Sequence, residues 1–295
     1  MGTVKDTAAV CPVCAGALRP WIRKMGRDVR RCGQCAQIVV PEGVARRADG
    51  ASIYESADAI FEADGNAEYY LDETNARAAR VKLAYVARFC PPGARLLDVG
   101  ASYGHFLAVA VETYNASGID VSATAASWGR AAFGVNLTVG SVYGMSEERG
   151  GTCGAITFWD VIEHLEDPAA ALDEIRRSLV PGGWLFVSTP DAGSLVAQLL
   201  GSRWHYLDPV QHINLFSRAN LVRLLSDRGF TVVHHRYFGR SYRVGYVVNR
   251  LMYLSARGVA SSPGENRNAF ASRFRNLIIP IKLWDVVGVA ARRND

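Results

Sequence analysis

The chain lacks the features that would place it in a membrane or an export route. Its 295 residues contain no stretch that approaches the roughly 20 uncharged apolar residues needed to span a bilayer. The first residues, MGTVKDTAAVCPVC, contain no apolar run typical of a secretory signal. Internal repeats and low-complexity runs are also absent. We therefore expect a cytoplasmic globular protein, long enough for one full α/β domain and a smaller module.

Cysteine is scarce and unevenly placed, which argues against a disulfide framework. Six cysteines occur, and four of them form two C-x-x-C pairs near the N-terminus. In the spacing C-x2-C-x17-C-x2-C, each pair forms a tight turn, and four thiolates complete the tetrahedral shell that Zn²⁺ prefers in structural sites. The four ligands are Cys11, Cys14, Cys32 and Cys35. The pattern predicts a closed zinc ribbon over residues 1–45, whose metal serves folding rather than catalysis.

The net charge of +5 is unevenly distributed along the chain. Residues 1–50 carry nine basic and four acidic side chains, and residues 236–295 carry eleven and three. Residues 51–235 carry thirteen and twenty-one. Two basic ends around an acidic middle fit an anionic acceptor such as a nucleotide-sugar, a phosphorylated metabolite or RNA. They fit a solvated surface of uneven charge equally well.

From residue 67 onwards, the apolar pattern alternates between helical and strand periodicity. The expected strands cover residues 95–100, 116–120, 136–140, 155–160, 184–189, 230–237 and 283–291. The expected helices cover residues 67–89, 104–113, 123–133, 169–179, 194–200 and 218–228. This alternation predicts an α/β fold with a parallel sheet between two layers of helices. The expected domains are a linker and helical segment at 46–92 and a main domain at 93–295, with an insertion at 239–280 that contains an apolar-faced helix around 244–256.

The first strand of the main domain ends in a glycine-containing turn that is suited to a ligand. It reads Asp98-Val-Gly100-Ala-Ser102-Tyr-Gly104, and a carboxylate, Asp120, ends the next strand. Glycines let the backbone turn sharply and approach a ligand, and a carboxylate at the end of the second strand accepts hydrogen bonds from ribose hydroxyls. A dinucleotide site would need G-x-G-x-x-G around a pyrophosphate, which Asp98 would repel. A cofactor with a cationic amino group and no phosphate fits this turn better than a dinucleotide does.

Four motifs in order resemble those of the class I S-adenosylmethionine-dependent methyltransferases. They are LLDVGASYGHF, GIDVS, FWDVIEHLEDP and SLVPGGWLFVSTP, and the resemblance covers about residues 67–238. It implies a Rossmann-like seven-stranded sheet whose last strand is antiparallel, with an N-terminal helix that caps the cofactor. The implied cofactor contacts are Asp98, Gly100, Ser102, Gly104, Asp120, Val121, Ser141, Trp159 and Asp160. Ser141 stands where many relatives carry an acidic residue, so Ser141 or a main-chain carbonyl would contact the adenine. Trp159 would line the methyl-transfer end, or it merely packs in the core.

Transfer to an oxygen acceptor also calls for a base. Three histidines, His164, His205 and His212, are candidates, and His212 lies in the stretch DPVQHINLFS after the fifth strand. A similar H-x-N-x-F-S stretch occurs in relatives from bacterial sugar and secondary-metabolite pathways. The alternative is that His212 orders its own loop by hydrogen bonding to the main chain.

A divalent metal on the acceptor side is also considered. Asp160, Glu163 and His164, at i, i+3 and i+4, resemble a set that some quinone-biosynthesis and RNA-end methyltransferases use for such an ion. The E-H-L and D-P pattern also occurs in methyltransferases that lack this metal. We therefore assign Glu163 and His164 a structural role and expect no catalytic metal.

Three functions are compatible with the sequence. The first is methyl transfer from S-adenosylmethionine to a small molecule, such as a sugar, a nucleotide-sugar or a natural-product intermediate. The second is RNA methylation, because residues 19–31 interleave Trp21 with basic side chains. The third is a non-catalytic interaction protein that retains the cofactor fold, and the intact Asp98, Gly100, Gly104 and Asp120 argue against it.

Overall fold

The computed structural model describes residues 10–43, 73–244 and 277–295. A seven-stranded sheet forms its centre, in the order β10-β13-β8-β7-β4-β5-β6. The strands are β4 (Arg95–Val99), β5 (Asn115–Asp120), β6 (Leu137–Val139), β7 (Cys153–Trp159), β8 (Leu179–Pro190), β10 (Phe230–Tyr237) and β13 (Val286–Arg293). Strands β4 to β8 pair in parallel, whereas β13 is antiparallel to both of its neighbours. The predicted doubly covered sheet with an antiparallel last strand is confirmed.

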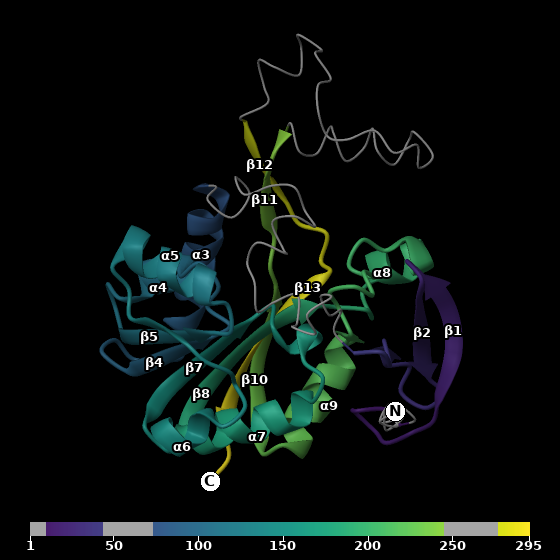
Figure 1. The fold of residues 1–295 in the computed structure, drawn as a ribbon, viewed down its shortest axis with the longest axis horizontal. Helices are drawn as coiled ribbons and strands as arrows, with labels where there is room; N and C mark the ends of the chain where they lie inside the picture. Colours follow the sequence, from purple (N-terminus) through teal and green to yellow (C-terminus); the bar gives the residue numbers. More distant parts are fainter. Residues whose placement is uncertain (1–9, 44–72, 245–276) are drawn as a thin grey trace.

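Helices cover both faces of this sheet (Figure 1). They are α3 (Glu73–Val86), α4 (His105–Ala110), α5 (Ala123–Phe133), α6 (Met145–Arg149), α7 (Pro168–Ser178), α8 (Leu195–Leu200) and α9 (Arg218–Asp227). Tyr85 of α3 and Leu107 of α4 pack into one buried apolar cluster, and Leu172 of α7 and Leu221 of α9 into another. None of the helices in the described ranges combines the length and apolarity that crossing a bilayer requires.

Most helix and strand ends fall where local chemistry predicts them. Ser217 caps α9, with its hydroxyl accepting from the Asn220 N–H, and Gly229 adopts a φ of 80° after the helix. Strand β8 begins earlier than predicted, because the Pro181–Gly183 turn forms an irregularity within the strand instead of preceding it. Strand β13 starts at Val286, after Trp284, which has a φ of 55°.

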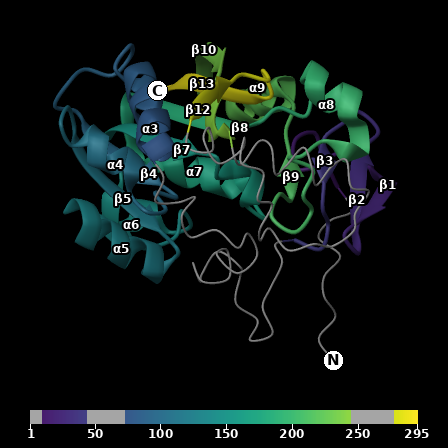
Figure 2. The same cartoon turned by 90° about the horizontal axis from the view of Figure 1, so that it is seen from above.

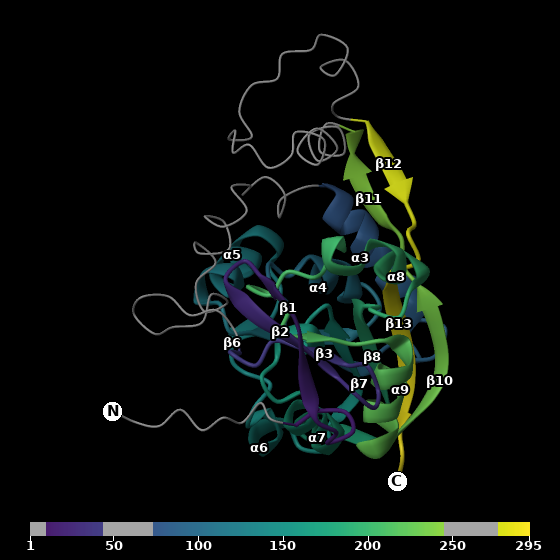
Figure 3. The same cartoon turned by 90° about the vertical axis from the view of Figure 1, so that its right-hand side faces the viewer.

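The predicted insertion begins and ends in a two-stranded antiparallel ribbon. Strand β11 (Arg240–Arg243) pairs with β12 (Ile278–Ile281), and this ribbon extends beyond the central sheet (Figure 3). The predicted helix at 244–256 lies outside the described residues, apart from Val244. The first part of the predicted helix 67–89 also lies outside them.

The N-terminal module forms a four-stranded antiparallel sheet. Its strands are β1 (Leu18–Lys24), β2 (Arg27–Cys32), β3 (Ile38–Val39) and β9 (Asn214–Leu215), in that order. Strand β9 comes from the main domain and from the same stretch as His212. The N-terminal strands lie beside α8, away from α3 to α5 (Figure 2). The ribbon predicted as a separate module is therefore completed by the main domain.

Further hydrogen bonds attach the ribbon to the segment that precedes β9. The Val40 N–H donates to the Ile213 carbonyl at 2.8 Å, and the Arg27 guanidinium donates to the Pro209 carbonyl at 3.0 Å. From α9, the Asn220 amide donates to the carbonyl of Cys35 at 3.1 Å. The ribbon thus holds the loop that carries His212 by its main chain.

Candidate active site

The carboxyl ends of β4 and β5 carry the turn that the sequence assigns to the cofactor. Gly100, Ser102 and Gly104 have φ values of 73°, 49° and 76°. A Cβ at Gly100 would lie 2.4 Å from Cγ2 of Val161, so both the backbone conformation and the space require glycine there. Ser102 occupies the left-handed region without being glycine, at a cost of about 1 kcal/mol.

Asp120, at the end of β5, lies against this turn. Its Oδ2 accepts from the Ser102 N–H at 2.6 Å, and its Oδ1 accepts from the Ser122 N–H at 2.8 Å. Burial raises the pKa of Asp120, and these two main-chain bonds oppose that rise. Each carboxylate oxygen has two lone pairs, so the group has capacity for two further hydroxyl donors. Its chemistry therefore fits the vicinal hydroxyls of a ribose.

Asp98 lies inside β4, only 2% exposed. The Thr157 hydroxyl donates to its Oδ1 at 2.6 Å. Burial raises the pKa of Asp98 to about 7, while the Thr157 bond and the charge of Lys82 oppose the rise. A cationic group placed beside Asp98 would favour its ionised form. This carboxylate therefore fits an amino group better than a phosphate.

Asp160 and Trp159 end β7 beneath α3. Asp160 has a φ of 57°, accepts from the Ser188 hydroxyl at 2.9 Å and pairs with the Lys82 ammonium at 3.1 Å. The Trp159 ring packs against Phe106 and the neighbouring aromatic rings of the core, as the packing interpretation expects. Its Nε1–H, however, is buried without a hydrogen-bond partner among the described residues. Sequence reasoning missed Lys82, because no local motif marks a lysine on α3 that reaches Asp160.

Val121 and Ser141 are expected to contact the cofactor at its adenine end, and of the expected contacts these two have the least support from the structure. Val121 is exposed beside Asp120, and the Ser141 hydroxyl accepts from the Tyr143 N–H at 3.2 Å within its own turn. Their contacts with the cofactor stay predictions.

His164 and His212 come together at the carboxyl end of the sheet. His164 belongs to the short 3-10 helix η1 (Ile162–His164) after β7, and its ring centroid lies 5.0 Å from that of His212. The Nδ1 of His164 is 2.8 Å from the Gln211 carbonyl, and the Nδ1 of His212 is 2.7 Å from the Tyr206 carbonyl. Burial lowers the pKa of His164, which favours the neutral imidazole. The hydrogen bond that orders the His212 loop is therefore present.

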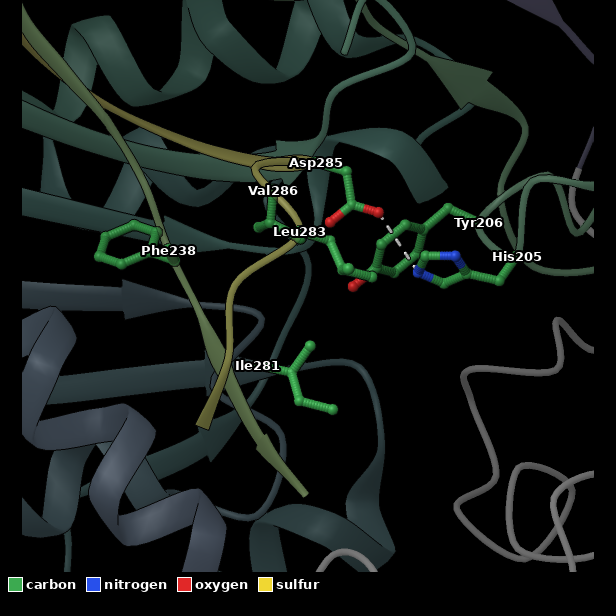
Figure 4. A pocket seen from close by; sticks show the side chains of 7 residues that line it. All are labelled: His205, Tyr206, Phe238, Ile281, Leu283, Asp285 and Val286. Atoms are coloured by element: carbon green, nitrogen blue, oxygen red, sulfur yellow. Dashed lines mark ion pairs between the residues drawn. The ribbon is translucent and has the colours of Figure 1, made fainter. Parts of the chain in front are cut away.

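His205 lines a separate pocket at the start of β13 (Figure 4). The Nε2 of His205 is 3.5 Å from the buried Asp285 carboxylate, which also accepts from the Trp204 Nε1–H at 3.3 Å. The lining residues are His205, Tyr206, Phe238, Ile281, Leu283, Asp285 and Val286. The pocket therefore combines one imidazole–carboxylate pair with apolar walls. The sequence provided no indication of Asp285, which is far along the chain from His205.

Arg236, Arg240 and Arg243 belong to the basic region 236–295, which the charge pattern relates to an anionic acceptor. The Arg236 guanidinium lies over the rings of Tyr85 and Phe238, at 5.6 and 5.1 Å from their centroids, so it packs within the domain. Arg240 and Arg243 belong to β11. Tyr69 and Tyr70, in the first part of the helix expected to cap the cofactor, lie outside the described residues.

The four N-terminal cysteines converge in the ribbon. The Sγ–Sγ distances are 3.5 Å for Cys11–Cys35, 3.4 Å for Cys14–Cys32 and 3.3 Å for Cys14–Cys35, and none forms a disulfide. Ligands of a tetrahedral ion with bonds of about 2.3 Å would lie about 3.8 Å apart, so the cluster fits zinc. Burial and the neighbouring Cys14 raise the pKa of Cys11 and of Cys35, a cost that a bound cation would offset.

Comparison with known proteins places these features in a family. A family model described as "Methyltransferase domain" matches residues 70–235. Over 117 residues the chain is 36% identical to a ubiquinone biosynthesis O-methyltransferase of Xanthomonas campestris, covering 37% of this chain and 48% of that protein. The chain thus spans about half the length of these curated relatives. A malonyl-[acyl-carrier protein] O-methyltransferase of Methylococcus capsulatus is 30% identical over 208 residues, 66% of this chain and 70% of that protein.

Solved structures share the fold at low identity. An S-adenosylmethionine-dependent methyltransferase of Thermotoga maritima aligns with a TM-score of 0.51 at 18% identity, over 80% of this chain and 99% of that chain. The YcgJ protein of Bacillus subtilis aligns with a TM-score of 0.53 at 16% identity, over 74% and 99%. Because the matched region contains both the turn after β4 and Asp120, the chain belongs to the class I S-adenosylmethionine-dependent methyltransferases.

Proposed function

We propose that this protein transfers a methyl group from S-adenosylmethionine to a hydroxyl oxygen of a small molecule. A sugar, a nucleotide-linked sugar or a natural-product intermediate is the proposed acceptor. The observation that carries the proposal is the His205–Asp285 pair in a confined pocket at the same end of the sheet as the cofactor turn. The O-methyltransferase names of the relatives support an oxygen acceptor.

On the cofactor side, each residue has a separate role in this proposal. Asp120 holds the ribose hydroxyls, the turn from Gly100 to Gly104 lies against the cofactor backbone, and Asp98 faces the amino group. The bound cofactor supplies a methyl group activated by a sulfonium centre, so positioning of the acceptor provides much of the rate. Trp159 and the Lys82–Asp160 pair border the region between the two sites.

On the acceptor side, His205 acts as the general base. Its imidazole takes the hydroxyl proton as the new C–O bond forms and the C–S bond breaks, which leaves a neutral thioether. Asp285 stabilises the imidazolium that results, in the way that a carboxylate supports a catalytic histidine. The Phe238 and Ile281 side chains form part of the apolar wall beside this pair (Figure 4).

The ribbon has a structural role in the same proposal. Four thiolates hold one zinc ion, which fixes β1 to β3. Because β3 pairs with β9, the zinc site also orders the loop that carries His212.

The first test concerns the ribose contact. Asp120→Ala removes a partly buried carboxylate whose hydrogen bonds to two hydroxyls would be worth about 1.5–3 kcal/mol each. We expect its affinity for S-adenosylmethionine, measured by calorimetric titration, to fall by at least about tenfold. Thermal unfolding of the variant provides the control, since the same carboxylate also holds Ser102 and Ser122. An affinity equal to that of the wild type in a folded variant would refute the assigned pocket.

The second test uses the pKa of Asp98. The raised pKa, about 7, means that the carboxyl group is protonated below that pH and ionised above it. Since the ionised form attracts the cationic amino group, affinity for S-adenosylmethionine should rise roughly five- to tenfold from pH 6 to pH 7.5. Asp98→Asn should flatten this profile in the same titrations. A wild-type affinity that is constant over this range contradicts the assignment.

The third test separates chemistry from cofactor binding. His205→Ala should bind S-adenosylmethionine within about twofold of the wild type, but transfer label from methyl-labelled cofactor to a bacterial metabolite extract about 10²–10⁴-fold more slowly. His235→Ala is the matched control, because His235 is an exposed histidine on β10 bonded to Arg218. Equal rates for wild type and His205→Ala would remove His205 from the mechanism.

The fourth test concerns the ribbon. Cys14→Ser should lose about one equivalent of zinc by elemental analysis. Hydrogen exchange of the β9 amides that face β3 should then become at least about tenfold faster, because β9 (Asn214–Leu215) loses its partner strand. The amides of β5 serve as the internal control. Loss of zinc without faster exchange in β9 would disprove the proposed coupling.

A further inference from the structure

The indole N–H of Trp159 has no role in the proposed mechanism, although it is a buried polar group. The residue is only 7% exposed, and its Nε1 has no hydrogen-bond partner among the described residues. The buried side-chain atoms in the described ranges that lack a partner are Nε1 of Trp159, Oδ1 of Asn214, Nε of Arg228 and Nε of Arg293. The other three side chains each form a hydrogen bond through another atom. An indole offers no second polar atom, so Trp159 has no such compensation.

The packing of the Trp159 ring keeps the N–H in this position. The ring centroid lies 5.6 Å from that of Phe106, 6.4 Å from that of Phe186 and 6.0 Å from that of Phe238. The Lys82 ammonium lies 5.3 Å from the same ring. In a close-packed interior these neighbours oppose a rotation that would bring Nε1 to a protein acceptor. A buried donor without an acceptor costs free energy, so the N–H fits a partner that arrives with a ligand.

Trp159 lies between the cofactor turn and the pocket that contains His205. Phe106, in the first turn of α4, is two residues after Gly104, the last residue of the cofactor turn. Phe238, another ring that contacts Trp159, lines the pocket, and Figure 4 shows it on the opposite side of the pocket from His205. A small molecule that extends from the pocket toward the cofactor therefore approaches the Trp159 ring.

We propose that the Trp159 Nε1–H donates a hydrogen bond to an oxygen of the bound acceptor, beside the hydroxyl that is methylated. This inference rests on the proposed function, in which His205 takes the proton of that hydroxyl. The lone pair of the neighbouring oxygen accepts from Nε1, so two points hold the acceptor for in-line transfer. Because Nε1 is buried in the ligand-free chain, the acceptor displaces the Phe238 ring as it enters.

This hydrogen bond selects a class of acceptor. A donor that stays unpaired when its oxygen is missing discriminates strongly against a ligand that lacks the oxygen. The site therefore favours acceptors with two neighbouring oxygens, such as a diol, a hydroxy ketone or a hydroxy acid, over acceptors with a single hydroxyl. Trp159 is in this sense a specificity-determining residue.

The test replaces the indole by a benzene ring in Trp159→Phe, which retains the aromatic packing and removes the N–H. Its affinity for S-adenosylmethionine should stay within about twofold of the wild type, while transfer of label from methyl-labelled cofactor to a bacterial metabolite extract should be at least about tenfold slower. Trp184→Phe is the matched control, because Trp184 also packs on Phe186, at 6.3 Å, and it should transfer label at the wild-type rate. Thermal unfolding of both variants checks that they are folded.

Indole ¹H–¹⁵N spectra provide a readout that a packing role alone would not change. The chain has six tryptophans, and Trp159→Phe identifies the signal of Trp159. With S-adenosylhomocysteine bound, which has no methyl group to transfer, addition of the metabolite extract should move this signal downfield and leave that of Trp184 in place. His205→Ala should show the same shift, because His205 takes the proton and has no part in this hydrogen bond.

Two results would overturn the role of Trp159. One is a folded Trp159→Phe variant that transfers label at the wild-type rate. The other is a Trp159 signal that responds to S-adenosylhomocysteine alone and not to the extract, which would make the indole a cofactor contact. Wild-type protein that transfers no label, but whose Trp159 signal still moves with the extract, would contradict the proposed function and support the hydrogen bond, so the two failures are distinguishable.

Discussion

The carboxylate of Asp120 joins the two loops on which the cofactor end of the sheet depends. It accepts from the main chain of Ser102 in one loop and of Ser122 in the other. The parallel pairing of β4 with β5 brings these loops side by side, and the positive φ values of Gly100 and Gly104 aim the first loop toward Asp120. This carboxylate, together with the Gly104 N–H bond to the Ala101 carbonyl, holds Ser102 in its left-handed conformation.

The acceptor side is built differently, from contacts between segments far apart in the chain. Strand β3 of the ribbon pairs with β9, and the next residue back from β9, Ile213, is bonded to both Val40 and Glu163. The four-cysteine cluster of the ribbon and the pair His164 and His212 are therefore connected through a few main-chain hydrogen bonds. The ribbon therefore holds a loop of the main domain in addition to folding its own strands.

Sequence patterns predict the features whose residues lie close together along the chain. Alternating periodicity predicted the seven strands of the central sheet and its helices except α6, which no expected range covers. The spacing of Cys11 and Cys14 with their partners predicted a convergent thiolate cluster. The turn after β4 was visible because its glycines and Asp98 lie within seven residues. In each case, neighbours along the chain are also neighbours in space.

Sequence patterns do not predict contacts between residues that are far apart in the chain. A two-residue strand such as β9 has too short a pattern to reveal its partner, and Lys82 reaches Asp160 only because α3 packs over β7. His205 faces Asp285 across 80 residues of chain. His212 likewise lies beside Glu163 and His164 through tertiary packing, and no local spacing indicates this contact.

The most direct measurement of the central claim is the fate of the methyl group. Wild-type protein and Asp120→Ala are each incubated with methyl-labelled S-adenosylmethionine, a bacterial metabolite extract and, separately, total RNA. We expect label in the small-molecule fraction with the wild type and a strong reduction with Asp120→Ala. Label in RNA alone, or no transfer to either fraction by wild-type protein that binds the cofactor, would contradict it.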